Sequence, residues 1–122
     1  MADASSGPVR ILVVEDEYLL ADDLADALTA LGAQVIGPVG VLAEALALAE
    51  TAPINGAILD INLHGQMVFP LADVLAAKGV PYVFATGYGQ ESLPEAYQGV
   101  PTLSKPVNAQ ALQPLLAAAR AG

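Results

Sequence analysis

The chain has no cysteine, and only four Lys and Arg residues stand against thirteen Asp and Glu. The missing cysteines exclude disulfides, zinc-thiolate sites and thiol chemistry, and they agree with a reducing compartment. A net charge of −9 repels nucleic-acid phosphates and anionic membrane surfaces, so we expect neither as a partner. No stretch approaches the ~20 apolar residues of a membrane span, and the N-terminus lacks the apolar core of a signal peptide. We therefore expect a cytoplasmic protein.

Apolar residues, in contrast, are abundant, at 55% of the sequence with a mean hydropathy of +0.55. A chain of 122 residues is long enough for one hydrophobic core and too short for two ordinary domains. So high an apolar content favours elements that are buried on more than one face, as in a layered α/β fold. We expect a loose N-terminal arm at 1–8 and a single domain at 9–120.

Short β-rich runs alternate with helical patterns along the chain. Strands are predicted at 9–14, 34–36, 57–61, 82–85 and, more weakly, 102–103. Helices are predicted at 17–31, 41–50, 70–78 and 109–119, where Pro114 requires a kink or a later start. The glycine-containing segment 87–99 has room only for a short helix. This alternation implies a doubly wound α/β fold, in which a five-stranded parallel sheet carries helices on both faces.

Polar residues follow the ends of four of these strands. Glu15 and Asp16 end the first strand, Asp60 the third and Thr86 the fourth, and the fifth runs into Lys105. Because the carboxyl ends of parallel strands face one crevice, we expect these side chains to meet there. Three neighbouring carboxylates repel one another unless a cation lies between them, and Mg²⁺ prefers oxygen ligands. We therefore expect Mg²⁺ bound by Asp16, Asp60 and, through water, Glu15.

With a cation present, Asp60 stays ionised and can attack phosphorus to form an aspartyl phosphate. The Thr86 hydroxyl can then bond one phosphoryl oxygen, while the Lys105 ammonium neutralises another. Each residue type is weak evidence alone, since an Asp at a strand end is often only a solvated residue or a helix cap. Their convergence favours a phosphoacceptor site.

At these residues the chain resembles the receiver domain of two-component response regulators, from residue 9 to 120. The resemblance implies a flavodoxin-like (βα)5 fold with strand order 2-1-3-4-5, and a phosphoryl group passed to Asp60 from a histidine kinase or a histidine phosphotransfer protein. It also implies a main-chain carbonyl ligand to Mg²⁺ at Asn62 and a cis peptide bond between Lys105 and Pro106. Such a protein is a signalling switch rather than an enzyme, and it acts through protein contacts or by draining phosphate from a kinase.

The segment FATGYG, residues 84–89, is similar to the signature of the FAT GUY subgroup, many of which are single-domain receivers of alphaproteobacteria. That likeness implies histidine kinases of the HWE or a related type. Two positions depart from the wider receiver pattern: Glu15 replaces the usual aspartate, and Thr102 replaces the aromatic residue that switches in most receivers. Signal propagation would then use the segment 87–99. Tyr88 would screen the phosphorylated site from water.

Other readings remain open. A phosphatase with an aspartate nucleophile would want an acidic residue at position 62, which is Asn62. A pseudo-receiver would bind partners without phosphorylation. A homodimer through the 87–120 face is possible. His64 is read as a solvated loop residue, and the acidic run of the first helix as its solvated face, which is also where receivers meet kinases: Asp22, Asp23 and Asp26.

Overall fold

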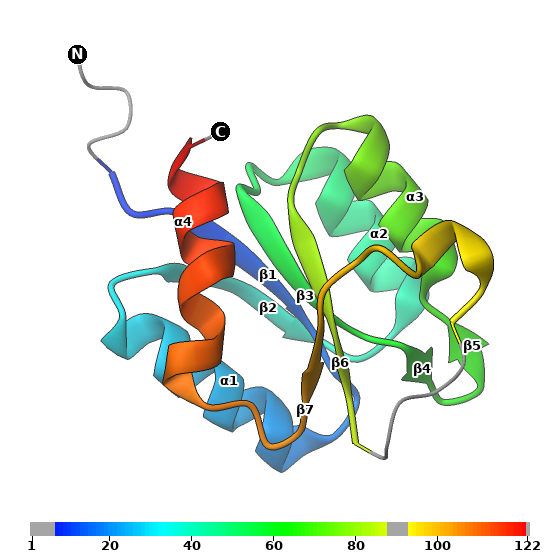
Figure 1. Ribbon diagram of the computed structural model, residues 1–122, viewed down its shortest axis with the longest axis horizontal. Helices are drawn as coiled ribbons and strands as arrows, with labels where there is room; N and C mark the ends of the chain where they lie inside the picture. Colours follow the sequence, from blue (N-terminus) through cyan, green and yellow to red (C-terminus); the bar gives the residue numbers. More distant parts are fainter. Residues whose placement is uncertain (1–6, 88–92, 122) are drawn as a thin grey trace.

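A five-stranded parallel sheet forms the centre of the computed structural model, which describes residues 7–87 and 93–121. The strand order is β2-β1-β3-β6-β7, which confirms the predicted flavodoxin-like arrangement (Figure 1). The strands of this sheet are β1 Arg10–Val14, β2 Gln34–Val39, β3 Gly56–Asp60, β6 Tyr82–Thr86 and β7 Thr102–Ser104.

Helices cover both faces of the sheet. The helices α1, Tyr18–Ala30, and α4, Gln113–Ala121, pack on one face, while α2, Leu42–Thr51, and α3, Phe69–Ala77, pack on the other (Figure 1). Among the described residues, no helix is long and apolar enough to cross a membrane.

The central strands are buried on both faces because their side chains alternate between the two helical layers. In β1, Ile11 and Val13 point into the core under α1 and α4, while Leu12 and Val14 point into the core under α2 and α3. A strand of this kind is an unbroken aliphatic run, which is how it can be recognised in a sequence. The run stops where the strand reaches the edge of the core, and the charged residues begin there.

The first helix follows the predicted amphipathic pattern. Leu24 and Leu28 are buried, while the acidic residues Asp22, Asp23 and Asp26 are exposed. The helix ends beside Gly32, whose φ of 90° is a left-handed conformation that glycine adopts without strain. The apolar stripe of this helix therefore fixes how the acidic face is turned to solvent.

Three elements differ from the sequence expectations. The strand β2 continues to Val39 through a cis Gly37-Pro38 peptide, three residues beyond its predicted end. A two-stranded hairpin, β4 Asn62–Leu63 and β5 Gln66–Met67, follows β3 and was not predicted. Strands of two residues are too short to show a periodicity of two, which explains the omission.

The end of the chain agrees with the expectation of a later helix start. A 3₁₀ turn, Ala109–Leu112, precedes α4, and Pro114 falls in the first turn of α4, where its missing N–H costs nothing. Asn108 caps the 3₁₀ turn by accepting a hydrogen bond of 2.9 Å from the main-chain N–H of Ala111. In the described part of 87–99, the helical structure is the short 3₁₀ turn η2, Glu95–Tyr97.

Four of the chain's six aromatic residues meet on the α2 and α3 side of the sheet. Phe69 of α3 stacks on Tyr97 of η2 with ring centroids 4.5 Å apart, and both meet Phe84 of β6 edge to face. Tyr82 completes the group beside Phe84. These four residues, the aromatic cluster, join η2 to α3 and to the strand that ends in Thr86.

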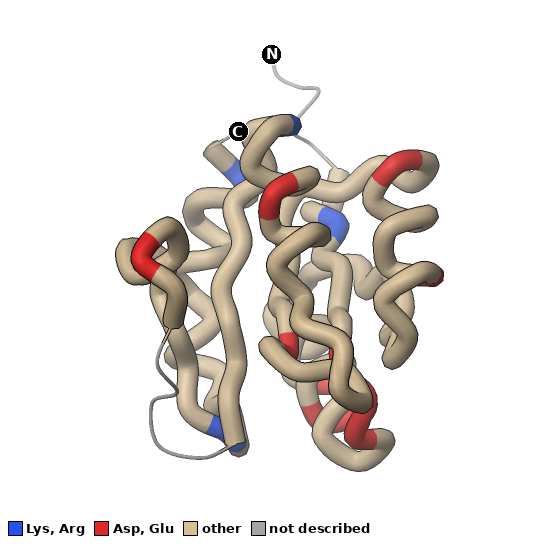
Figure 2. Tube along the Cα trace, turned by 90° about the vertical axis from the view of Figure 1, so that its right-hand side faces the viewer, with Lys and Arg blue, Asp and Glu red and all other residues tan. Residues whose placement is uncertain are grey.

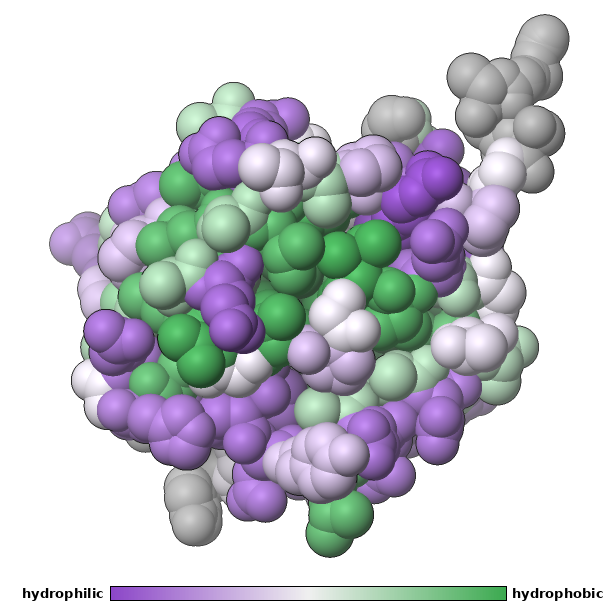
Figure 3. Space-filling model, turned by 180° about the vertical axis from the view of Figure 1, so that it is seen from behind, coloured by the Kyte–Doolittle hydropathy of each residue, from purple (hydrophilic) through white to green (hydrophobic). Residues whose placement is uncertain are grey.

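The β2 edge of the sheet lies on the side of the molecule opposite β7. Viewed from behind, a broad hydrophobic area surrounded by hydrophilic residues lies on this side of the surface (Figure 3).

Candidate functional site

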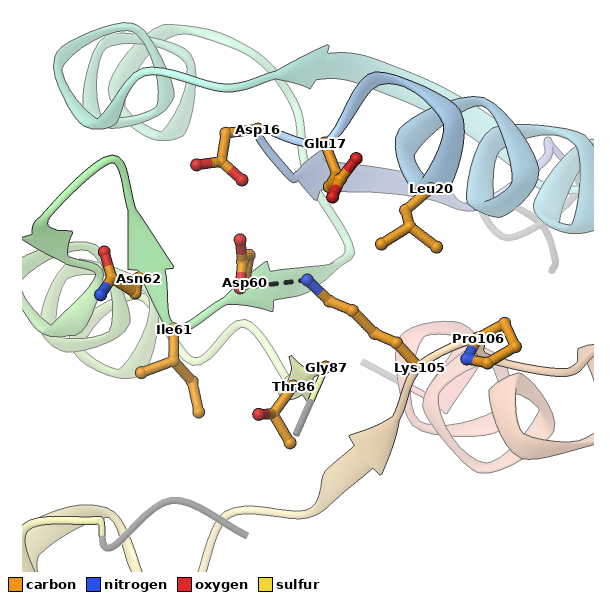
Figure 4. A pocket seen from close by; sticks show the side chains of 10 residues that line it. All are labelled: Asp16, Glu17, Leu20, Asp60, Ile61, Asn62, Thr86, Gly87, Lys105 and Pro106. Atoms are coloured by element: carbon orange, nitrogen blue, oxygen red, sulfur yellow. Dashed lines mark ion pairs between the residues drawn. The ribbon is translucent and has the colours of Figure 1, made fainter. Parts of the chain in front are cut away.

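A cleft of about 490 Å³ opens at the carboxyl end of the parallel sheet. It contains the phosphoacceptor candidate, the hydroxyl and the ammonium that the sequence predicts, although they come from three different strand ends (Figure 4). Acidic residues gather at this end of the sheet, which is the lower end in Figure 2. The residues lining the cleft are Asp16, Glu17, Leu20, Asp60, Ile61, Asn62, Thr86, Gly87, Lys105 and Pro106.

Glu15 lies behind the cleft rather than in its wall, and it is only 3% exposed. Its main-chain N–H donates to the carbonyl of Val39 at 2.9 Å, so the pairing of β1 with β2 continues one residue past the strand. Its side chain turns inward, and Oε2 accepts a hydrogen bond of 2.9 Å from the N–H of Glu17. The acidic pair is thereby divided: Glu15 faces the interior and Asp16 faces the cleft.

The ammonium of Lys105 lies between two carboxylates that come from different strands. Its Nζ is 2.7 Å from Oε1 of Glu15 and 3.2 Å from Oδ1 of Asp60, and the lysine side chain is only 9% exposed. The main-chain N–H of Lys105 donates to the carbonyl of Thr86, and the Lys105-Pro106 peptide is cis, as the resemblance implied. In this structure an ammonium therefore offsets part of the repulsion among the carboxylates.

The surroundings of Asp60 favour its neutral form. Burial and the neighbouring charge of Glu15 raise the pKa of Asp60 from 3.8 to about 7, although Lys105 opposes them. Burial alone would lower the pKa of Lys105, but its contacts with Glu15 and Asp60 more than offset this, so its pKa lies above the ordinary value. A divalent cation at the carboxylates would lower the pKa of Asp60 and keep it ionised.

The carboxylates fit a hard divalent cation. Glu15, Asp16 and Asp60 each offer an oxygen, and these oxygens lie within 4.8 Å of one another. Among the described residues, the buried Oε1 of Glu15 has no hydrogen-bond partner of good geometry, and it lies 2.7 Å from the Lys105 ammonium. An all-oxygen, acidic donor set of this kind suits Mg²⁺.

Two further predicted site residues lie at the cleft. Thr86 ends β6 and is buried, at 6% exposed, with its side chain in the cleft wall. Asn62 also lines the cleft, and its side-chain Oδ1 accepts a hydrogen bond of 2.7 Å from the N–H of Gly65. The side chain of Asn62 thus shapes the turn that follows, while a role for its main-chain carbonyl stays a prediction. Tyr88 lies outside the described residues.

One contact of the site was not predicted from the sequence. His64 is exposed, as expected, but its main-chain N–H donates to Oδ2 of Asp16 at 3.0 Å, and its Nδ1 lies 3.5 Å from the same oxygen. The available signal was the glycine at position 65, directly after His64. Glycine at the second position of a two-residue loop is typical of a tight hairpin, but histidine is not one of the preferred residues at the first position.

Comparisons with known proteins agree with this geometry. No protein-family model matches the chain. The transcriptional regulatory protein PdtaR of Mycobacterium tuberculosis is 35% identical over 95 residues, which cover 77% of this chain and 46% of PdtaR. The chain thus spans about half the length of this curated relative.

Solved structures match over nearly the whole chain. The solution structure of SdrG from Sphingomonas melonis is 41% identical, covers 93% of this chain and 98% of SdrG, and has a TM-score of 0.82. The signal receiver domain of a modulated diguanylate cyclase from Desulfovibrio desulfuricans is 30% identical, covers 93% of this chain and 94% of that domain, and has a TM-score of 0.77. With its sheet order and with its acidic, hydroxyl and ammonium groups at one cleft, the chain belongs to the response regulator receiver family.

Proposed function

We propose that this protein accepts a phosphoryl group on Asp60 from a phosphohistidine, carried by a histidine kinase or by a histidine phosphotransfer protein. The observation that carries this proposal is the position of Asp60. It lies in an open cleft, 3.2 Å from the Lys105 ammonium and beside two further carboxylates. A nucleophile, a counter-charge and a cation-binding group therefore converge at one point.

The proposed transfer needs little from the protein beyond positioning and charge. An oxygen of Asp60 attacks phosphorus, the P–N bond of the phosphohistidine breaks, and its electron pair leaves with the imidazole. Mg²⁺, held by Asp16, Asp60 and, through water, Glu15, would neutralise charge on the phosphoryl oxygens. Lys105 supplies a positive charge from the end of the edge strand β7, and the Thr86 hydroxyl donates to one phosphoryl oxygen. The reaction is self-catalysed and consumes the acceptor, so it is not enzymatic turnover.

Its partners follow from the same proposal. The FATGYG segment, residues 84–89, supports a place in the FAT GUY subgroup, with kinases of the HWE or a related type as phosphate donors. SdrG also has a BeF₃-activated conformation, which supports a similar response to a phosphoryl mimic here. With Thr102 at the position of the usual aromatic switch, the signal would pass through the 87–99 segment and on to protein contacts. A homodimer through the 87–120 face is one such contact.

Intact mass tests the acceptor directly. The protein is incubated with acetyl phosphate, with and without Mg²⁺, beside an Asp60→Asn variant and a known receiver in separate tubes. We expect a gain of one phosphoryl group that requires Mg²⁺ and is absent from the variant. If the known receiver is labelled and this protein is not, either its phosphate is too short-lived to accumulate or the chain is a pseudo-receiver that binds partners without phosphorylation.

A further inference from the structure

The contact between His64 and Asp16 joins the site to the hairpin that follows the phosphoacceptor. In this hairpin Leu63 pairs with Gln66, so the loop between the two short strands consists of His64 and Gly65 alone. Both loop residues have positive φ, 52° for His64 and 89° for Gly65. Positive φ at both central residues is the mark of a type I′ turn. His64 is thus held in a left-handed conformation, in which Asn, Asp and His are enriched among the residues other than Gly.

The hairpin is anchored to the core, so that its His64 N–H has a fixed position relative to Asp16. Leu63 is only 1% exposed and belongs to the core under α2 and α3, while the N–H of Val68 donates to the carbonyl of Ile61 at 2.9 Å. Inside the turn, Oδ1 of Asn62 accepts the Gly65 N–H. The base and the tip of the hairpin are therefore both fixed, and the N–H of His64 is directed outward to Asp16.

The main chain of His64 is the stronger part of this contact. Its N–H donates to Oδ2 of Asp16 at 3.0 Å, whereas the imidazole Nδ1 is 3.5 Å away and the side chain is 74% exposed. An exposed pair at that distance contributes little. A main-chain donor to a carboxylate is a charge-assisted hydrogen bond, and it does not depend on the identity of the side chain.

We propose that the turn at His64 and Gly65 is a positioning element, which orients Asp16 for cation binding through the main-chain N–H of His64. This inference rests on the proposed function, because it requires Asp16 to be a Mg²⁺ ligand. Carboxylates that bind metals are commonly oriented by hydrogen bonds from outside the ligand shell. Here the donor comes from the hairpin that follows the phosphoacceptor in the sequence, so the segment after Asp60 also holds Asp16.

Substitutions at position 64 distinguish the effect of the turn on cation binding from the effect of the imidazole. His64→Asn creates Asn-Gly, the preferred pair for a type I′ turn, and His64→Gly adopts positive φ without strain. Both variants lose the imidazole but keep the turn and its N–H. His64→Val is the matched opposite, since a β-branched residue at φ 52° is strained and should open the turn. The hairpin lies outside the main sheet, so all three proteins should fold.

Titration with MgCl₂ alone, followed by amide NMR shifts, measures the effect on cation binding. We expect the Asn and Gly variants to bind Mg²⁺ as the wild type does, and the Val variant to bind about tenfold more weakly. Equal affinity in the Val variant would overturn the inference, and so would an equal loss in all three variants, which would assign the role to the imidazole. If the wild type itself shows no saturable Mg²⁺ binding, the proposed use of Mg²⁺ fails first and this inference fails with it.

Discussion

Lys105 and Glu15 form an ion pair across the site, with 2.7 Å between Nζ and Oε1 and with side chains that are only 9% and 1% exposed. The two residues come from opposite sides of the sheet centre, since β1 and β7 lie on either side of β3. Breaking a buried pair by removing one partner is costly because the other charge stays buried. This ion pair is therefore structural as well as part of the proposed chemistry.

Replacement of that lysine should destabilise the protein. In Lys105→Met, Glu15 and Asp60 lose their shared cation, and we expect a loss of about 3 kcal/mol in the free energy of unfolding at pH 8. The loss should be smaller at pH 5.5, because Asp60 can then take up a proton. Urea unfolding at the two pH values measures it. Adding Glu15→Gln to Lys105→Met should restore part of the stability, and a double variant that is less stable than the single one would contradict this account.

Without Mg²⁺, Asp60 should make the stability depend on pH. The pKa of its carboxyl is raised by burial and by Glu15 from 3.8 to about 7, so the folded protein binds the proton more tightly than the unfolded chain does. This contribution is fully present below pH 3.8 and is lost as the pH rises to about 7. Because solvent reaches the cleft, we expect Asp60→Asn to be only about 1 to 2 kcal/mol more stable than the wild type at pH 8 in EDTA.

The stability advantage of Asp60→Asn over the wild type should shrink toward pH 4, where the wild-type carboxyl is neutral as well. Excess Mg²⁺ should make the wild type more stable than Asp60→Asn at pH 8, since it binds the folded wild type and stabilises it by mass action. Urea unfolding curves in EDTA and in MgCl₂ make the comparison. A wild type that gains stability from pH 5 to pH 8 in EDTA would show that Asp60 is ionised throughout.

Gly40 should be sensitive to the addition of one methyl group. A Cβ there would lie 3.1 Å from Cα of Asp16 and 3.3 Å from the carbonyl oxygen of Glu15. These are backbone atoms, so the loop of the acidic pair would have to move. We expect Gly40→Ala to weaken Mg²⁺ binding and slow labelling by acetyl phosphate, at a stability cost of about 1 kcal/mol. Gly99→Ala is the control, because its Cβ would meet nothing within 4 Å.

Tyr97 should report whether η2 takes part in signalling. Its hydroxyl donates to Oδ1 of Asp73 at 2.8 Å, and this bond raises the pKa of Tyr97 above its ordinary value. Tyr97→Phe keeps the ring but loses the bond, so we expect a stability loss of about 0.5 kcal/mol and faster amide exchange at 93–99.

The phosphoryl mimic BeF₃⁻ provides the second half of that test. If the signal passes from Thr86 through β6 and the aromatic cluster, the mimic should change hydrogen exchange at 93–99 in the wild type. The change should be smaller in Tyr97→Phe, where the connection to α3 is already weakened. Unchanged exchange in the wild type, with the mimic shown to be bound, would exclude this route.

The sheet was predictable because the main signals are long and consistent. Aliphatic runs that stop at a charge mark where β1 and β3 leave the core, and the crossover rule then fixes which end of the sheet carries Asp60 and Lys105. The later start of α4 was predictable from Pro114, whose missing N–H is tolerated only in a first turn. In each case the signal comes from residues that are neighbours in the sequence.

The features of the fold and of the site that were not predicted depend on contacts between distant segments or on elements too short to show a hydrophobic periodicity. The hairpin after β3 has two-residue strands, and β2 continues through Gly37-Pro38, where local propensity argues for a stop. The sequence predicted an acidic cluster that needs a cation, but not that the Lys105 ammonium lies between Glu15 and Asp60. Nor did it predict that a main-chain N–H would hold Asp16, since such a donor has no side-chain signature.

The aromatic side chains are distributed unequally between the two helical layers, so their circular dichroism signal can distinguish one layer from the other. The aromatic cluster lies in the layer of α2 and α3, whereas the described core under α1 and α4 is entirely aliphatic. The chain has no tryptophan, and Tyr18 is 78% exposed. Near-ultraviolet circular dichroism should therefore report mainly on one half of the molecule. A state that loses this signal but keeps its helical signal would have loosened around η2 and α3, while the layer beneath the acidic face could still be packed.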